Sequence, residues 1–195
     1  MAANIRGILL AAGYSTRFGS NKLLQALPAG ATRAGMPIAV AAAHHLLDVL
    51  PDSLAVVRPR AQKLGALLRN AGYNTVLCRN ASEGMGTSLA AGIRAAPDAD
   101  GWVVALADMP FVLPDTIRSV AQALRAGAAM AAPSFRGERG HPVGFSRRYY
   151  ADLCALRGDE GARLLLARHP ESVTLLEVQD RGVLRDIDKP SDLEP

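Results

Sequence analysis

The stretch Ile8-Leu9-Leu10-Ala11-Ala12-Gly13-Tyr14-Ser15-Thr16-Arg17-Phe18-Gly19-Ser20-Asn21-Lys22 decides the fold. The apolar run that ends at Leu10 predicts a buried strand, and the small residues after it predict a sharp turn. Gly13 and Gly19 permit backbone conformations that a β-carbon resists and let a ligand approach closely. Arg17 and Lys22 add positive charge beside the N–H groups of the loop. The stretch is therefore typical of a strand that leads into a loop for a triphosphate.

Two better-known phosphate loops do not fit this stretch. The Walker loop has four residues between its glycines and a Lys-Ser/Thr pair, whereas five residues separate Gly13 from Gly19, and Leu23 follows Lys22. The dinucleotide fingerprint Gly-x-Gly-x-x-Gly is absent, because Tyr14-Ser15 follows Gly13.

Composition predicts an ordinary globular protein. The chain has 195 residues, of which 21% are charged and 49% hydrophobic. This length suits one domain, residues 1–195, and is short for two. The net charge is +4, but the basic residues are scattered and aromatic residues make up only 5%, so a nucleic-acid surface is not favoured. The first apolar run is too short for a signal peptide or a membrane span, and we expect a cytoplasmic protein.

Strand-like and helix-like segments alternate along the chain. After the first strand, further strands are expected at 53–57, 74–78, 102–107, 128–132, 173–178 and 183–185, and helices at 37–50, 60–70, 84–96, 114–125, 147–156 and 160–168. Residues 23–37, rich in breakers, predict an irregular loop. Cys78 and Cys154 are too far apart for a metal or redox motif and are expected to be reduced. The alternation predicts an α/β layered fold with a mostly parallel sheet.

Three acidic residues follow apolar strands or close the chain. Asp108 comes directly after the all-apolar run 102–107, at the edge of a parallel sheet where ligands bind, and it suits a hard cation such as Mg²⁺. A turn-capping role is the alternative. Asp186 and Asp188 lie two residues apart and share one side of an extended segment, so either is a candidate second ligand. For Asp188, as for Ser191, a helix N-cap role is equally open.

Two glycine-rich segments lie further along the chain. Glu83-Gly84-Met85-Gly86-Thr87-Ser88 opens a helix and can offer amides and hydroxyls to a base, or can form a plain capped helix start. Gly140-His141-Pro142-Val143-Gly144-Phe145 lies in the last third of the chain. His141 could contact a second substrate, hold a tight turn, or act as a base.

The stretch from Leu10 to Lys22 resembles the Leu-Ala-Ala-Gly-x-Ser-x-Arg-x-Gly-x-x-Lys signature of MobA- and MocA-type nucleotidyltransferases at every fixed position. Asp108-Met109-Pro110 looks like their second signature, and 83–92 with Asn80 is similar to their base-recognition element. The stretches 140–145 and Gly158-Asp159-Glu160-Gly161-Ala162-Arg163 are similar to the region of these enzymes that meets the second substrate. The resemblance covers nearly the whole chain and implies a Rossmann-like three-layer α/β/α fold, with the acceptor side at about 134–195. The longer loop at 27–35 is the main departure.

The resemblance also implies roles for individual residues. Arg17 and Lys22 would contact the phosphates, and Asp108 with Asp188 would hold Mg²⁺. The nucleotide would lie against Leu10, Ala11, Ala12, Gly13, Ser15, Arg17, Lys22, Asn80, Gly84, Gly86 and Ser88. His141, Pro142 and Gly144 would meet the acceptor.

The expected reaction is attack of the terminal phosphate of molybdopterin on the α-phosphate of CTP, with release of pyrophosphate. CTP is favoured because Ala11-Ala12-Gly13 looks like the MocA form. A molybdoenzyme or its chaperone would receive the product. Alternatives are guanylyl transfer from GTP, a sugar-phosphate acceptor, a reductase, and a non-catalytic carrier; the missing dinucleotide fingerprint argues against the reductase.

Overall fold

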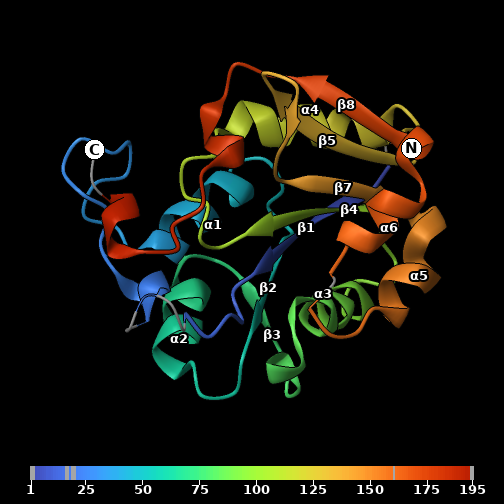
Figure 1. The fold of residues 1–195 in the computed structure, drawn as a ribbon. Coiled ribbons are helices and arrows are strands. Elements are labelled where there is room, and N and C mark those ends of the chain that lie inside the picture. The colour runs from blue at the N-terminus through green and yellow to red at the C-terminus, as the bar shows by residue number, and fades with distance from the viewer. Residues whose placement is uncertain (1–2, 16–17, 19–20, 160, 194–195) are drawn as a thin grey trace.

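One twisted sheet runs through the protein, and its strands lie in the order β3-β2-β1-β4-β7-β5-β6, with β8 paired to β5 (Figure 1). The computed structural model describes residues 3–15, 18, 21–159 and 161–193. The eight strands are β1 (Ile5–Leu10), β2 (Leu54–Val57), β3 (Asn74–Leu77), β4 (Gly101–Leu106), β5 (Met130–Phe135), β6 (Glu138–Arg139), β7 (Val143–Ser146) and β8 (Val173–Glu177).

The first four strands are parallel, as the alternation of strands and helices predicts. β1 pairs with β2 and β4, and the register sets Leu10 beside both Val56 and Leu106. The carboxyl ends of β1, β2 and β4 therefore meet at one edge of the sheet. β7 then enters antiparallel between β4 and β5, and β8 returns parallel to β5. The sheet is mostly parallel in its first half and mixed in its second.

Helices cover both faces of this sheet and make three layers (Figure 1). One apolar cluster joins one face of the sheet to α1 (Ile38–Leu47), α2 (Gln62–Asn70) and α4 (Pro114–Arg125). A second cluster joins the other face to α3 (Met85–Arg94), α5 (Tyr150–Ala155) and α6 (Arg163–Arg168). Alternate residues of β1 supply both clusters, since Leu9 belongs to the first and Ile8 to the second. Within the described chain, no helix is long and apolar enough to cross a membrane.

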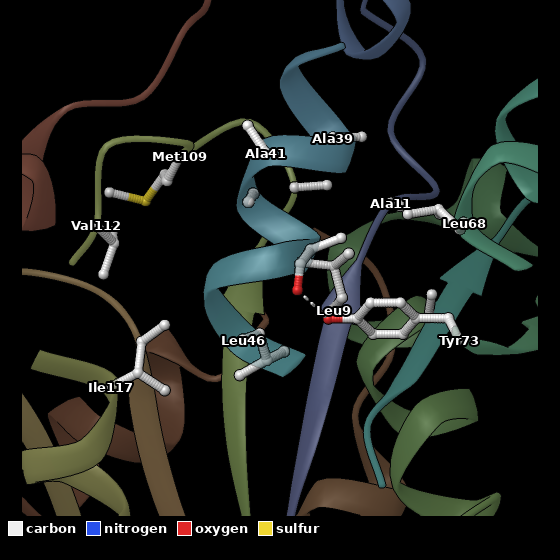
Figure 2. Close-up of a cluster of buried hydrophobic side chains, with 14 of the residues drawn as sticks. Leu9, Ala11, Ala39, Ala41, Leu46, Leu68, Tyr73, Met109, Val112 and Ile117 are labelled. Carbon is white, nitrogen blue, oxygen red and sulfur yellow. Dashed lines mark hydrogen bonds between the residues drawn. The ribbon is translucent and has the colours of Figure 1, made fainter. Parts of the chain in front are cut away.

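The first cluster shows how the parallel half is held together (Figure 2). Leu9 of β1 and Leu46 of α1 are fully buried in it. Tyr73, just before β3, is buried as well, and its hydroxyl donates a 2.9 Å hydrogen bond to the Ala43 carbonyl of α1. Because the buried hydroxyl is paired, the ring can fill the core without leaving an unsatisfied polar group.

The turn before α4 is fixed by a residue that is distant in sequence. The Leu113 N–H and the Thr116 hydroxyl donate to one carboxylate oxygen of buried Asp180, at 2.8 and 2.7 Å. Pro114 occupies the first turn of the helix, where its missing N–H costs nothing. The predicted helix at 114–125 is confirmed with both ends correct.

Asp180 also explains an error of the sequence analysis. A strand is expected at 183–185, but Arg181–Leu184 forms a 3-10 turn. The second Asp180 carboxylate oxygen accepts the Gly182 N–H at 2.9 Å, which turns the chain there. Gly182 is pressed against the Phe111 carbonyl with no room for a β-carbon. This contact joins Gly182 to a loop 71 residues earlier, so the sequence around Gly182 alone could not predict it.

Other boundaries differ by a few residues. The strand expected at 128–132 is β5 at Met130–Phe135, the helix expected at 160–168 is α6 at Arg163–Arg168, and part of the glycine-rich 137–145 segment forms β6 and β7. The 23–37 segment is irregular as predicted. The Leu27 N–H donates to the Met36 carbonyl at 2.8 Å and the Gly35 N–H donates to the Leu27 carbonyl at 2.9 Å, which closes the segment into a turn. Cys78 and Cys154 are both unpaired thiols, as expected.

Candidate active site

The chain stays hydrogen-bonded to the sheet for one residue beyond β1, and the backbone of the loop that follows is uncovered at Gly13. The Ala11 N–H still donates to the Val56 carbonyl at 2.9 Å, so the chain follows the sheet to that point. A β-carbon on Gly13 would meet no atom within 4 Å, which leaves the backbone accessible. Among the described residues of this loop, Ser15 has a left-handed backbone with φ of 53°, whereas Gly13 does not. Arg17 and Gly19 lie outside the described residues.

A hollow of about 270 Å³ lies between this loop and the start of α3. The predicted nucleotide residues that line it are Leu10, Ala12, Gly13, Ser15, Lys22, Gly84 and Ser88. Ala11, Asn80 and Gly86, also predicted, are not among its lining residues. Asp159, which belongs to the 158–163 stretch that resembles the second-substrate region of the family, forms part of its wall.

Lys22 joins the two carboxylates that the sequence analysis proposed as metal ligands. Its Nζ lies 2.9 Å from Asp108 Oδ2 and 2.7 Å from Asp188 Oδ1. Lys22 is only 8% exposed, so its ammonium group is held between the two acids. Burial lowers the pKa of Lys22, but the hydrogen bonds and charges of Asp108 and Asp188 outweigh it and raise the pKa above its ordinary value. Lys22 therefore stays charged throughout the physiological pH range.

The end of the chain reaches the site through backbone contacts. The Ile187 N–H donates to the Asp108 carbonyl at 3.0 Å, which docks this segment beside the turn after β4. The Asp188 and Lys189 N–H groups donate to Asp192 Oδ2 at 2.8 and 2.7 Å. Asp192 thus caps this turn, and the Asp188 carboxylate faces Lys22 instead.

A third carboxyl lies near these two. Burial raises the pKa of Asp186, and the negative charges of Asp188 and Asp108 raise it further. No hydrogen bond or ion pair joins Asp186 to Lys22 among the contacts of the described residues, whereas Asp108 and Asp188 both contact it. Of the two aspartates at 186 and 188, the structure brings Asp188 to Lys22.

The two carboxylates of Asp108 and Asp188 suit a hard cation that also binds substrate. No three His, Cys, Asp or Glu side chains in the described ranges form a complete metal cage. Asp108 and Asp188 together offer carboxylate oxygens converging on one positive charge. Mg²⁺ is usually held by one or two carboxylates, with waters and substrate phosphates as its other ligands. The pair of acids fits that pattern.

The glycines at the start of α3 are explained by packing against another loop. A β-carbon on Gly84, which has φ of 125°, would overlap the Gly158 carbonyl. The Gly86 N–H donates to the Gly158 oxygen at 2.8 Å, so this amide is used within the protein. Of the predicted base-binding loop, Gly84 and Ser88 face the hollow.

A second hollow of about 270 Å³ adjoins the first and shares Leu10, Met85, Leu106 and Asp159 with it. Its floor is apolar, with Phe145 and Leu166 among the lining residues. Arg139, His141 and Arg163 supply its polar side chains in addition to Asp159. Arg163 belongs to the 158–163 stretch that resembles the second-substrate region of the family, whereas Arg139 was not among the predicted site residues.

The three predicted acceptor residues lie in different places. His141 lines the second hollow. Pro142, joined to it by a cis peptide bond, lines a small internal cavity next to it. Gly144 faces the opposite side of the sheet, where a β-carbon would lie 2.9 Å from Val120 of α4. Gly144 therefore allows a close approach between β7 and α4 and does not reach the hollow.

Comparisons with known proteins agree with this geometry. Residues 7–173 match the family model of the MobA-like NTP transferase domain. The chain is 32% identical to the purine catabolism protein PucB of Bacillus subtilis, over 96% of this chain and 93% of that protein. It is 28% identical to the nicotine blue oxidoreductase of Paenarthrobacter nicotinovorans, over 94% and 92% of the two chains. The manganese complex of Rv0371c from Mycobacterium tuberculosis matches with a TM-score of 0.79 and 25% identity, over 98% and 96% of the chains.

Proposed function

The chain belongs to the family of MobA-like NTP transferase domains and is a nucleotidyltransferase, and from this premise we propose that it transfers the cytidylyl group of CTP to molybdopterin with Mg²⁺. A terminal phosphate oxygen of the acceptor forms a bond to the α-phosphorus of CTP. The bond between the α- and β-phosphates breaks, and pyrophosphate leaves. No covalent intermediate with the protein is required.

The observation that carries this proposal is the position of Lys22 between Asp108 and Asp188 beside the open glycine loop. Phosphoryl transfer needs mainly positioning and neutralisation of charge. Lys22 would hold the α-phosphate, Arg17 would neutralise the departing pyrophosphate, and the backbone around Gly13 would cradle the phosphates. The raised pKa of Lys22 keeps that charge in place at neutral pH.

Asp108 and Asp188 are the residues that would hold Mg²⁺. The ion, when bound, neutralises the triphosphate and orients it for in-line attack. The manganese complex of the similar Mycobacterium tuberculosis protein supports the use of a divalent cation in this fold.

The second hollow is the proposed acceptor site, because it adjoins the nucleotide hollow and shares Leu106 and Asp159 with it. Its apolar floor would take a flat ring system, and Arg139 and Arg163 would attract an anionic substituent. The preference for CTP rests on the resemblance of Ala11-Ala12-Gly13 to the MocA form. Delivery to a molybdoenzyme or its chaperone, and a cytoplasmic location, stay predictions from the sequence.

A reductase that takes hydride from NADH or NADPH is the second candidate, because one similar protein is a nicotine blue oxidoreductase. The loop after β1 lacks the dinucleotide fingerprint, and the paired acids on Lys22 have no role in hydride transfer. A non-catalytic carrier would not need these paired acids either.

The test measures pyrophosphate release from CTP, GTP, ATP and UTP, each with Mg²⁺ and with or without molybdopterin. We expect acceptor-dependent release that is fastest with CTP. Faster pyrophosphate release with GTP would show that the protein transfers the guanylyl group and not the cytidylyl group. No release with any nucleotide, together with oxidation of NADH or NADPH by an added acceptor dye, would establish the reductase. Binding of molybdopterin without either reaction would establish the carrier.

A further inference from the structure

Two histidine nitrogens are buried without a hydrogen-bond partner, and both histidines line one small cavity. Nδ1 of His45 and Nδ1 of His141 are two of only three such side-chain atoms among the described residues. Both residues line the same internal cavity, which lies between α1 and the segment that contains Pro142. Leaving a buried polar atom unpaired costs about 1–3 kcal/mol, so two such atoms at one place require an explanation.

The size of the cavity limits what it can hold. Its volume is about 10 Å³, which matches the space that one water molecule needs. The other lining side chains are apolar, among them Met109, Val112 and Ile117, and none of them can donate a hydrogen bond. A donor to the two imidazoles therefore has to come from a guest of about that size.

The tautomer of the His45 ring follows from the hydrogen bond that its Nε2 makes. A hydrogen bond to the Val112 backbone involves the ring, and because Nδ1 has no partner, Nε2 is the donor to that carbonyl. Burial lowers the pKa of His45, so the ring is neutral at pH 7. In a neutral ring with its proton on Nε2, Nδ1 is an acceptor. His45 therefore presents a lone pair to the cavity.

His141 stands between this cavity and the second hollow, and lines both. Its Nδ1 is shielded from solvent although the residue as a whole is half-buried, so the exposed edge of the ring carries Nε2. Burial lowers the pKa of His141 despite the negative charge of Asp108, and the ring is neutral at pH 7.

We propose that one water in the cavity between α1 and Pro142 donates its two hydrogens to His45 Nδ1 and His141 Nδ1, and so holds His141 as an Nε2–H donor aimed at the second hollow. Water has two donors, which matches two facing acceptors. His45 is then a positioning residue, since it contacts no substrate and acts through the water and His141. On the proposed function, His141 donates to an oxygen of the anionic acceptor and does not act as a base.

Histidine NMR on the unliganded protein tests the proposal without any assumption about the reaction. Long-range ¹H–¹⁵N correlation spectra distinguish the two neutral tautomers of each imidazole. We expect both His45 and His141 to carry the proton on Nε2 at neutral pH. A proton on Nδ1 of His141 would overturn the proposal, whatever the enzyme does.

The substitution His45→Phe removes the second acceptor while filling similar volume. We expect the His141 Nδ1 resonance to shift and its Nε2–H tautomer to lose its dominance, while His44→Phe, one residue earlier on the same helix, changes neither. An unchanged His141 signal in folded His45→Phe protein would refute the water bridge. If that variant does not fold, the wild-type tautomers and an ordered water in a high-resolution crystal structure decide. Signals of metal-coordinated Nδ1 atoms that a chelator removes would assign the cavity to a metal and reject the water.

Enzyme kinetics give a second readout that rests on the proposed function. In His45→Phe, KM for the acceptor should rise about tenfold, the equivalent of one misoriented hydrogen bond, while KM for CTP stays unchanged. An equal loss for both substrates would indicate general damage to the fold and would contradict a positioning role.

Discussion

The two halves of the sheet build their parts of the site in different ways. In the parallel half, β1 and β4 end in register at Leu10 and Leu106, so the loops that follow them meet at one edge. In the mixed half, β7 runs antiparallel to both neighbours, and the acceptor side is assembled from β6, β7 and the start of α6. The nucleotide side therefore follows from strand order, whereas the acceptor side depends on contacts between distant segments. Predictions for the two sides differ accordingly.

The largest effect is expected in the parallel half. Asp108→Asn should lower kcat/KM about 10³-fold, because a neutral amide weakens both the metal site and the contact with Lys22. Steady-state pyrophosphate release measures it. Asp115→Asn is the matched control, since this exposed acid of α4 pairs with Arg118 and is not among the residues that line the hollow. Equal activity of Asp108→Asn and wild type would contradict the assignment of the site.

The contact between the two halves is tested at Gly84. Gly84→Ala should lower the free energy of unfolding by about 4 kcal/mol, because the new β-carbon strains a φ of 125° and overlaps the Gly158 carbonyl. Gly127→Ala separates the two causes, since φ there is 100° but no atom lies within 4 Å. It should cost about 2 kcal/mol from backbone strain alone. Chemical denaturation that shows equal losses would mean that the contact between α3 and the 157–159 loop contributes nothing.

The acceptor side should respond more weakly and more selectively. Arg139→Gln or Arg163→Gln should raise KM for the acceptor about tenfold, because each removes one cation from the rim of the second hollow, and should leave KM for CTP unchanged. Arg125→Gln, an exposed cation at the end of α4, should change neither constant. A rise in KM for CTP would place these arginines on the nucleotide and remove the distinction between the hollows.

The smallest effect concerns pH. The pKa of His45 and of His141 is lowered in the folded protein, so the unfolded chain binds more protons below about pH 6.5. Stability should therefore fall as pH decreases from 7.5 to 5.5, by at most about 1.4 kcal/mol per pH unit for each histidine. Denaturation curves of His45→Phe should show a shallower dependence. An identical slope would mean that His45 is not buried in its neutral form.

Local sequence was sufficient for most of the parallel half. The apolar run into Gly13 and the run into Asp108 each predicted a loop at a strand end, both residues line the first hollow, and the helix at 114–125 was predicted to the residue. Patterns failed where a distant partner decides the conformation. Asp180 turned an expected strand into a 3-10 turn, and Gly144 and Gly86 are glycines because other elements press on them.

What the sequence determined by itself is the family and the order of strands and helices, because these depend on local patterns and fixed spacings. The resemblance to the family also pointed to Lys22, Asp108 and Asp188 as site residues. Only the tertiary structure decided that Lys22 bridges the two acids, that Asp159, Arg139 and Arg163 border the hollows, and that His45 and His141 share one cavity. The physical reason is distance along the chain. The contacts of Lys22 with Asp188 and of Gly84 with Gly158 join segments that only the packing of the whole sheet and its helices brings together.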